Sequence, residues 1–184
     1  MKYVNHSGGC EGADMAWETV GLSYNVKTIA YSFEGHRQYS ANPHILTMQE
    51  LTVGWEACKK ASWTLGRRID QHSSTYTRKL LSRNWFQVKN AEAIYAIGTL
   101  VEGSDTLVNG GTGWAVQMAV DNNKQVYLFE QDLKTWMEYD TILEQFVRID
   151  YTPKLTQNFA GIGTRAITDD GLQAILNVYE ETFI

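Results

Sequence analysis

The stretch "NFAGIGTRAITDDG", residues Asn158 to Gly171, decides the fold because it contains three structural signals in a row. An apolar strand runs into a Gly-x-Gly turn, a Thr-Arg pair follows, and a helix is expected to start after Thr168. Thr168 suits the N-cap of that helix, and the two aspartates after it favour the first turn. Nucleotide-binding α/β domains usually open with such a unit, but here Gly171 lies only 13 residues before Ile184.

Two other glycine-rich turns lie between an apolar strand and a helix. They are "HSGGCEGAD" at 6–14 and "VNGGTGWA" at 108–115. Further strands are expected near 25–32, 91–100 and 124–131, and strands that alternate with helices predict a parallel sheet. We therefore expect one α/β domain over residues 1–184, a Rossmann-like, doubly wound and mostly parallel sheet of about five strands.

Two segments interrupt this alternation. Residues from about 33 to 90 form a helical insertion, in which Thr47 and Glu50 have capping-box spacing at the start of one helix. Residues from about 133 to 150 have the composition of a β-hairpin, and a helix over 132–146 is the alternative. In the helices that follow the first and last glycine turns, Leu22 and Leu172 are expected to face the core.

Composition excludes several classes of protein. With 184 residues and 43% hydrophobic residues, the chain suits one domain with a full core. A formal net charge of −5 argues against a dedicated nucleic-acid binder. Cys10 and Cys58 have neither zinc-site nor disulfide-framework spacing, so we expect no metal and no cofactor. No apolar run is long enough for a membrane span and no signal-peptide core is present, so we expect a cytoplasmic protein.

The three glycine turns predict where a ligand binds. In open α/β sheets, ligands bind beyond the carboxyl ends of the strands, where glycines allow close backbone approach and helix N-termini attract anions. A tight turn without any ligand would also use glycine, but three such turns at one end of a sheet favour a phosphate-bearing ligand. The chain contains neither GxGxxG with a following acid nor GxxxxGK[ST], so neither a dinucleotide fingerprint nor an ATP-hydrolysing P-loop is predicted.

Four blocks together resemble a known group of proteins. "SGGCEGAD", "SRNWFQV", "NGGTGWAVQMA" and "FAGIGTR" resemble the SLOG superfamily, the Rossmann-like group that includes DNA-processing proteins and the cytokinin-activating LOG enzymes. Phage and bacterial members carry "GIGSR", "SGGADGAD", "RN..QV" and "GGTGQA". The resemblance covers most of the domain outside residues 33–75 and 131–156.

The order of the blocks differs from that of the relatives, in which "GIGSR" comes first. Here "GIGTR" comes last, which predicts a circular permutation in which joining Ile184 to Met1 would restore the usual order. Exchange of the C-terminal block between two chains is the alternative.

The resemblance implies a set of ligand-binding residues. In the first glycine turn, Asp14 could accept a hydrogen bond from a ribose hydroxyl or cap its helix. In the second glycine turn, Trp114 could stack on a base. Arg83 and Arg165 could bind phosphate, or lie on solvated surfaces. The full set is Ser7, Gly8, Gly9, Gly12, Asp14, Arg83, Asn84, Gly110, Gly111, Thr112, Gly113, Trp114, Gly161, Gly163, Thr164 and Arg165. His36 and Arg37 lie in a loop near the same edge and are weaker candidates.

The expected function is binding of a phosphate-bearing nucleotide derivative, such as an ADP-ribose-type or cyclic nucleotide signal, by a sensor or a sequestering anti-defence protein. LOG enzymes cleave an N-glycosidic bond with a glutamate in the third block, but Gln117 holds that position here and cannot act as a general acid or base. A LOG-like hydrolase using Glu11, Glu34 or Glu102 is the first alternative, and single-stranded DNA processing is the second. The resemblance also implies a homo-oligomer.

Overall fold

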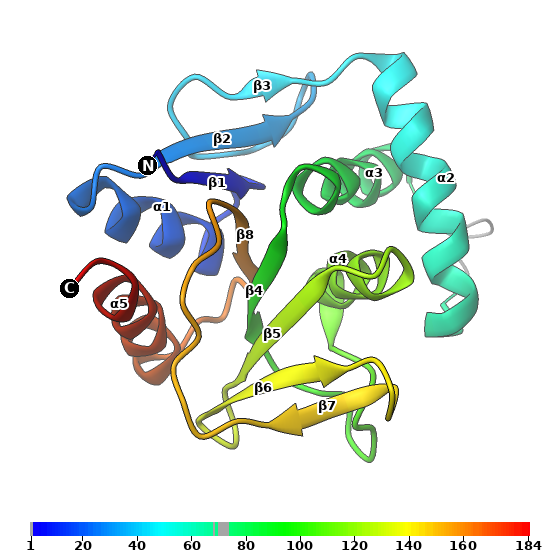
Figure 1. The fold of residues 1–184 in the computed structure, drawn as a ribbon. Helices are drawn as coiled ribbons and strands as arrows, with labels where there is room; N and C mark the ends of the chain where they lie inside the picture. Colours follow the sequence, from blue (N-terminus) through cyan, green and yellow to red (C-terminus); the bar gives the residue numbers. More distant parts are fainter. Residues whose placement is uncertain (1, 68, 70–73) are drawn as a thin grey trace.

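The computed structural model describes residues 2–67, 69 and 74–184, and these form one sheet with helices on both faces (Figure 1). The strands are β1 (Val4–Ser7), β2 (Lys27–Ser32), β3 (His44–Ile45), β4 (Ala93–Gly98), β5 (Gln125–Glu130), β6 (Thr135–Asp140), β7 (Gln145–Arg148) and β8 (Asn158–Gly163). The helices are α1 (Ala13–Ser23), α2 (Met48–Leu65), α3 (Thr75–Asn90), α4 (Gly110–Asp121) and α5 (Asp169–Phe183). None of these helices has the length and apolarity that crossing a membrane requires.

The sheet has the strand order β3-β2-β1-β8-β4-β5-β6-β7. Neighbouring strands from β3 to β5 in this order pair parallel. The pairs β5–β6 and β6–β7 are antiparallel. The predicted α/β fold is therefore confirmed, and residues 133–150 form the hairpin and not the helix. The sequence did not predict β3, because two residues in a polar loop carry no periodic signal.

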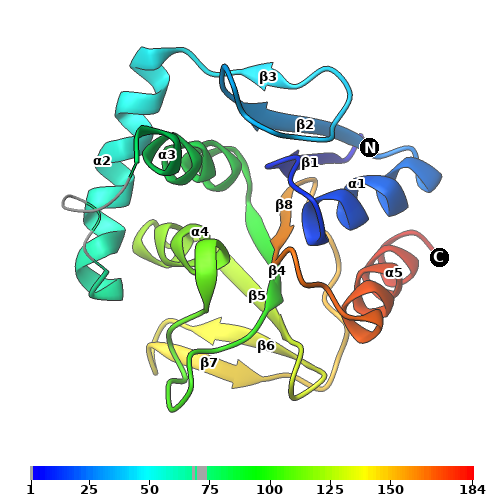
Figure 2. The ribbon, with the colours of Figure 1, turned by 180° about the vertical axis from the view of Figure 1, so that it is seen from behind.

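Strand β8 lies in the middle of the sheet although it is last in the chain (Figures 1 and 2). It pairs with β1 through Val4 opposite Asn158, and with β4 through Tyr95 opposite Gly161. Counted from β8, the central strands have the order 3-2-1-4-5, which is the order of doubly wound nucleotide-binding sheets. The rings of Tyr3 and Phe183 are in contact, with centroids 4.8 Å apart, so the two ends of the chain are neighbours. The circular permutation itself remains a prediction.

The helices cover the sheet unequally. Helices α1 and α5 pack together on one face, while α3 and α4 cover the other and α2 packs outside them (Figure 2). Each face has its own apolar core, one around Trp17, Tyr95 and Phe159 and the other around Ile94, Met118 and Leu128.

Helix α1 buries a narrow stripe that begins at Ala13 and includes Trp17 and Gly21. The Trp17 ring fits against β8 because Gly161 has no side chain, and a Cβ there would overlap the indole. The Tyr179 hydroxyl of α5 donates to the Trp17 carbonyl at 2.9 Å. The expectation for Leu22 is wrong: it lies one position beyond this stripe and is 73% exposed.

Helix α5 starts as predicted, since the Thr168 hydroxyl accepts from the Gly171 amide at 3.1 Å. The expectation for Leu172 is wrong, because the buried stripe instead follows Ala174, Ile175 and Val178.

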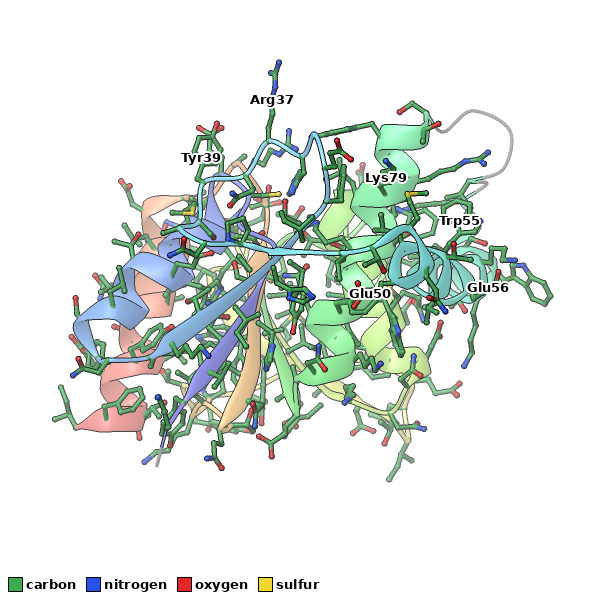
Figure 3. The ribbon with its side chains drawn as sticks, turned by 90° about the horizontal axis from the view of Figure 1, so that it is seen from above. Arg37, Tyr39, Glu50, Trp55, Glu56 and Lys79 are labelled. Atoms are coloured by element: carbon green, nitrogen blue, oxygen red, sulfur yellow. The ribbon has the colours of Figure 1, made fainter. Side chains whose placement is uncertain are left out.

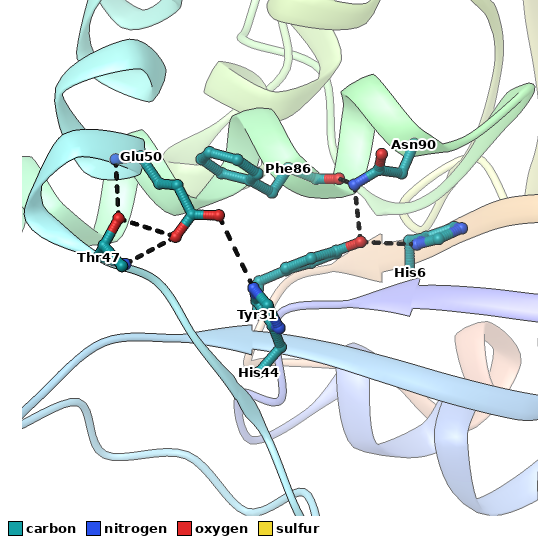
Figure 4. A network of polar contacts seen from close by, with 7 residues as sticks. All are labelled: His6, Tyr31, His44, Thr47, Glu50, Phe86 and Asn90. Atoms are coloured by element: carbon teal, nitrogen blue, oxygen red, sulfur yellow. Dashed lines mark hydrogen bonds and ion pairs between the residues drawn. The ribbon is translucent and has the colours of Figure 1, made fainter.

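A polar network fixes α3 to the first two strands (Figure 4). The Tyr31 hydroxyl of β2 contacts His6 Nδ1 at 3.0 Å and accepts from Asn90 Nδ2 at 2.7 Å. The predicted capping box of α2 forms, with Glu50 N donating to Thr47 Oγ1 and Thr47 N donating to the Glu50 carboxylate. These contacts hold the insertion against the sheet and set the position of α3, which carries Arg83 and Asn84.

The contact between Gly161 and Trp17 predicts a stability difference. Gly161→Ala should lower the free energy of unfolding by about 1–3 kcal/mol, since a methyl group there overpacks the core. Gly111→Ala is the control, because an added Cβ there meets no atom within 4 Å, and it should change that free energy by less than about 0.5 kcal/mol. Urea unfolding followed by circular dichroism measures both. Equal stability of the two variants would contradict this packing.

Candidate functional site

A cleft of about 880 Å³ opens beyond the carboxyl ends of the central strands. All three glycine turns contribute to it, the first through Asp14, the second through Gly110–Thr112 and the third through Gly163–Arg165. Helix α3 closes one side. The predicted residues that line the cleft are Asp14, Arg83, Asn84, Gly110, Gly111, Thr112, Trp114, Gly163, Thr164 and Arg165.

Arg83 has the most unusual environment in the cleft. It extends from α3 to the first glycine turn, where its guanidinium occupies the space that a side chain at Gly8 would need. It is only 5% exposed, and its Nε and Nη1 atoms have no hydrogen-bond partner among the described residues. Nη2 donates to Cys10 Sγ at 3.6 Å. A buried guanidinium with free N–H groups is costly, so this geometry fits an anion that would complete its hydrogen bonds.

Asp14 places a negative charge beside this arginine. Its Oδ2 atom accepts from the Cys10 amide at 3.2 Å. Burial raises the pKa of the Asp14 carboxyl to about 6, although the positive charge of Arg83 opposes the rise. The carboxylate therefore fixes the turn and partly balances Arg83, without forming an ion pair with it within 4.0 Å among the described contacts.

The N-terminus of α4 lies within the second glycine turn and faces the cleft. Asn109, at the N-cap, makes no side-chain cap bond, because its amide donates instead to Thr99 and Leu100. Arg67, at the end of α2, donates to the Gly110 and Val108 carbonyls at 2.8 and 2.9 Å. Arg67 thus binds carbonyl oxygens of the second glycine turn. The backbone N–H groups in the first turn of α4 stay available to an anion.

The third turn is braced by both of its neighbours. Thr164 N donates to the Ile97 carbonyl at 2.9 Å, and the Thr164 carbonyl accepts from Ala13 N at 3.0 Å. Gln131 Oε1 accepts from Thr168 N at 2.8 Å, which fixes the start of α5. Arg165 projects from this braced turn at the exposed rim of the cleft.

Six predicted residues do not line the cleft: Ser7, Gly8, Gly9, Gly12, Gly113 and Gly161. Ser7 is fully buried, and its hydroxyl donates to Glu18 at 2.8 Å. Gly161 lies inside β8 against Trp17. The glycines of the turns allow neighbouring backbone or side chains to approach closely. Trp114 does line the cleft but is only 6% exposed and belongs to the core.

Sequence reasoning missed other residues of the cleft. Cys10 lies inside the first turn, and Gln131 and Asp132 directly follow β5, so the rule that ligands bind at the carboxyl ends could have indicated all three. Leu80 and Leu81 form an apolar wall on α3, which only the packing of the insertion reveals. No group of three or more His, Cys, Asp or Glu side chains among the described residues is placed to hold a metal ion.

No protein-family model, no curated protein and no solved structure matches the chain.

Asp14 predicts a pH dependence of stability. The folded carboxyl has a pKa of about 6, against an ordinary value of 3.8, so stability present below pH 3.8 is lost as the pH rises through 6. This interval corresponds to roughly 3 kcal/mol. Asp14→Asn cannot ionise, so its free energy of unfolding relative to wild type should rise by about that amount between pH 4 and pH 7.5.

Urea unfolding across this pH range tests the Asp14 prediction. Asp132→Asn is the control, because Asp132 is an exposed carboxylate at the same cleft, and it should follow the wild type. A constant difference between Asp14→Asn and wild type at all pH values would show that burial does not perturb Asp14.

Proposed function

We propose that the protein binds a phosphate-bearing nucleotide derivative in this cleft. The observation that carries the proposal is Arg83, whose buried Nε and Nη1 atoms lack a partner among the described residues. The N-terminus of α4 and the side chain of Arg165 line the same cleft and add positive potential. Guanidinium N–H groups donate strong, charge-assisted hydrogen bonds to phosphate oxygens, which suits this position.

The remainder of the cleft suits the rest of a nucleotide. Its volume lies within the range of sites for small molecules and cofactors. Leu80, Leu81 and Trp114 supply apolar surface, while Thr99 and Asn109 supply polar groups for a ribose or base edge. One end of the cleft therefore attracts an anion, and the other end offers both apolar and polar groups. This combination favours a nucleotide over inorganic phosphate as the ligand.

The family resemblance points to a class of ligand and to a biological role. We propose that the chain is a circularly permuted SLOG-type protein, with a cytoplasmic nucleotide signal of ADP-ribose or cyclic type as its ligand. Such a protein would act either as a sensor of the signal or as a phage protein that sequesters it. A homo-oligomer remains part of this proposal through the resemblance alone.

Hydrolysis by a LOG-type mechanism is less well supported. Gln117 lies on α4 away from the cleft, with its Nε2 donating to Asp121 at 3.0 Å. Glu11, Glu34 and Glu102 are exposed, and none lines the cleft. Processing of single-stranded DNA is disfavoured by the net charge of −5. Incubation with a panel of nucleotides followed by chromatography separates binding from cleavage, and free base among the products would refute pure sequestration.

A thermal-shift assay with ADP and ADP-ribose tests the proposed site. Both ligands should raise the melting temperature of the wild type, because a ligand that binds only the folded state stabilises it. Arg83→Met should abolish this increase. Without ligand it should still melt cooperatively, because it removes both a buried charge that lacks full hydrogen bonding and the charge that balances Asp14, and these effects oppose one another.

Three further variants sharpen the thermal-shift test. Arg165→Ala should weaken the ligand-induced increase, and Gly111→Phe should block it by filling open space above the second turn. Arg148→Ala is the control, because Arg148 is an exposed arginine of β7 outside the cleft. Undiminished stabilisation in Arg83→Met would refute the site, and a loss in Arg148→Ala would indicate non-specific attraction.

A further inference from the structure

Cys10 lies between Arg83 and His36, and the binding proposal uses neither the thiol nor the imidazole. It lines the cleft, in the turn between β1 and α1. Its Sγ atom lies 3.8 Å from His36 Nε2 and accepts a hydrogen bond from Arg83 Nη2 at 3.6 Å. The other cysteine, Cys58, belongs to α2 and is fully buried in the core.

His36 is held in place on the opposite side of its ring. Its Nδ1 atom lies 2.9 Å from Ser32 Oγ, at the end of β2. The ring stacks on Phe33 at a centroid distance of 4.8 Å, and the His36 amide donates to the Phe33 carbonyl at 2.9 Å. With the proton on Nδ1 donated to Ser32, Nε2 is left as an acceptor for the Cys10 thiol.

We propose that Cys10 and His36 form a nucleophile and base pair that attacks an electrophilic carbon of the ligand in the cleft. This inference rests on the proposed function, because Arg83 would hold the phosphate of that ligand beside the thiol. The bond between Sγ and the carbon forms as the bond from that carbon to its leaving group breaks. The leaving group takes that electron pair, and the thiol proton passes to His36 Nε2. A nucleophile, an adjacent base and a third group that orients the base are the signature of covalent catalysis.

Burial and the charges around the pair keep it neutral at rest. Burial lowers the pKa of His36 to about 4, helped by Arg83 and Arg165, so the imidazole is a free base at neutral pH. Burial raises the pKa of the Cys10 thiol, an effect that Asp14 reinforces and Arg83 and Arg165 oppose. The resting pair is therefore neutral, and the base must take the proton during attack.

Alkylation of the full chain with iodoacetamide tests the pair. The S–C bond forms, iodide leaves, and intact-mass and peptide mass spectrometry report the rate at each cysteine. Cys10 should react at least ten-fold faster than Cys58. In the wild type, the Cys10 rate should fall only as His36 becomes protonated near pH 4. In His36→Gln, the reaction should need free thiolate, so its rate should rise about ten-fold per pH unit to above pH 9.

At pH 7, His36→Gln should slow the alkylation of Cys10 by on the order of 100-fold, which is the lower end of the contribution of general-base catalysis. Ser32→Ala keeps the imidazole and should give a smaller loss, which provides a second variant if His36→Gln fails to fold. Arg37→Gln is the matched control, since Arg37 is exposed next to His36 and points away from the molecule (Figure 3). Identical pH profiles in the wild type, His36→Gln and Ser32→Ala would overturn the pair.

A second measurement separates this inference from the binding proposal. Iodoacetate carries a carboxylate, so the arginines should raise its rate at Cys10 relative to the neutral iodoacetamide, and inorganic phosphate should compete. Loss of this preference in Arg83→Met, with alkylation of Cys10 still dependent on His36, supports both the anion site and the pair. If phosphate has no effect while His36 still controls the rate, the anion site fails and the pair stands.

Discussion

The pairing of β8 with β1 and β4 is the interaction on which the rest of the structure depends. Without β8, the described sheet would divide into the group β3-β2-β1 and the group β4-β5-β6-β7. The first and last described strands of the chain must therefore meet in the middle of the fold, and Gly161 allows Trp17 to pack directly over that junction. Pairing across so long a sequence separation carries a large loop-closure cost and is expected to slow folding.

The same pairing creates the cleft. Because β1, β8 and β4 are parallel neighbours, the glycine turns that follow them reach one edge of the sheet, and α3 brings Arg83 to that edge. A buried guanidinium with free N–H groups lowers stability, as does the buried carboxyl of Asp14. Such costs concentrate at functional sites, where a ligand supplies the missing partner.

Much of this arrangement could be predicted from local sequence, and the rest depends on packing. The strand and glycine-turn pattern around Gly163 and Gly111 predicts a parallel sheet with a ligand edge, because both signals are local. The burial of Arg83 is a property of how α3 lies on the sheet, and its helix alone fits a solvated face equally well. Cys10 and His36 are separated by 26 positions, so only the folded chain brings their side chains together. The expectation that Leu22 and Leu172 face the core is wrong because a hydrophobic pattern does not distinguish two helix orientations that differ by one residue.

We propose that the convergence of the glycine turns and Arg83 makes an anion site. The most direct measurement is a crystal structure of the protein soaked with tungstate, a phosphate-like anion whose tungsten atoms give an anomalous signal. We expect a tungsten peak in the cleft, with a tungstate oxygen within hydrogen-bonding distance of Arg83 Nε or Nη1. Tungstate bound only at other surfaces, with the Arg83 guanidinium still free, would contradict it.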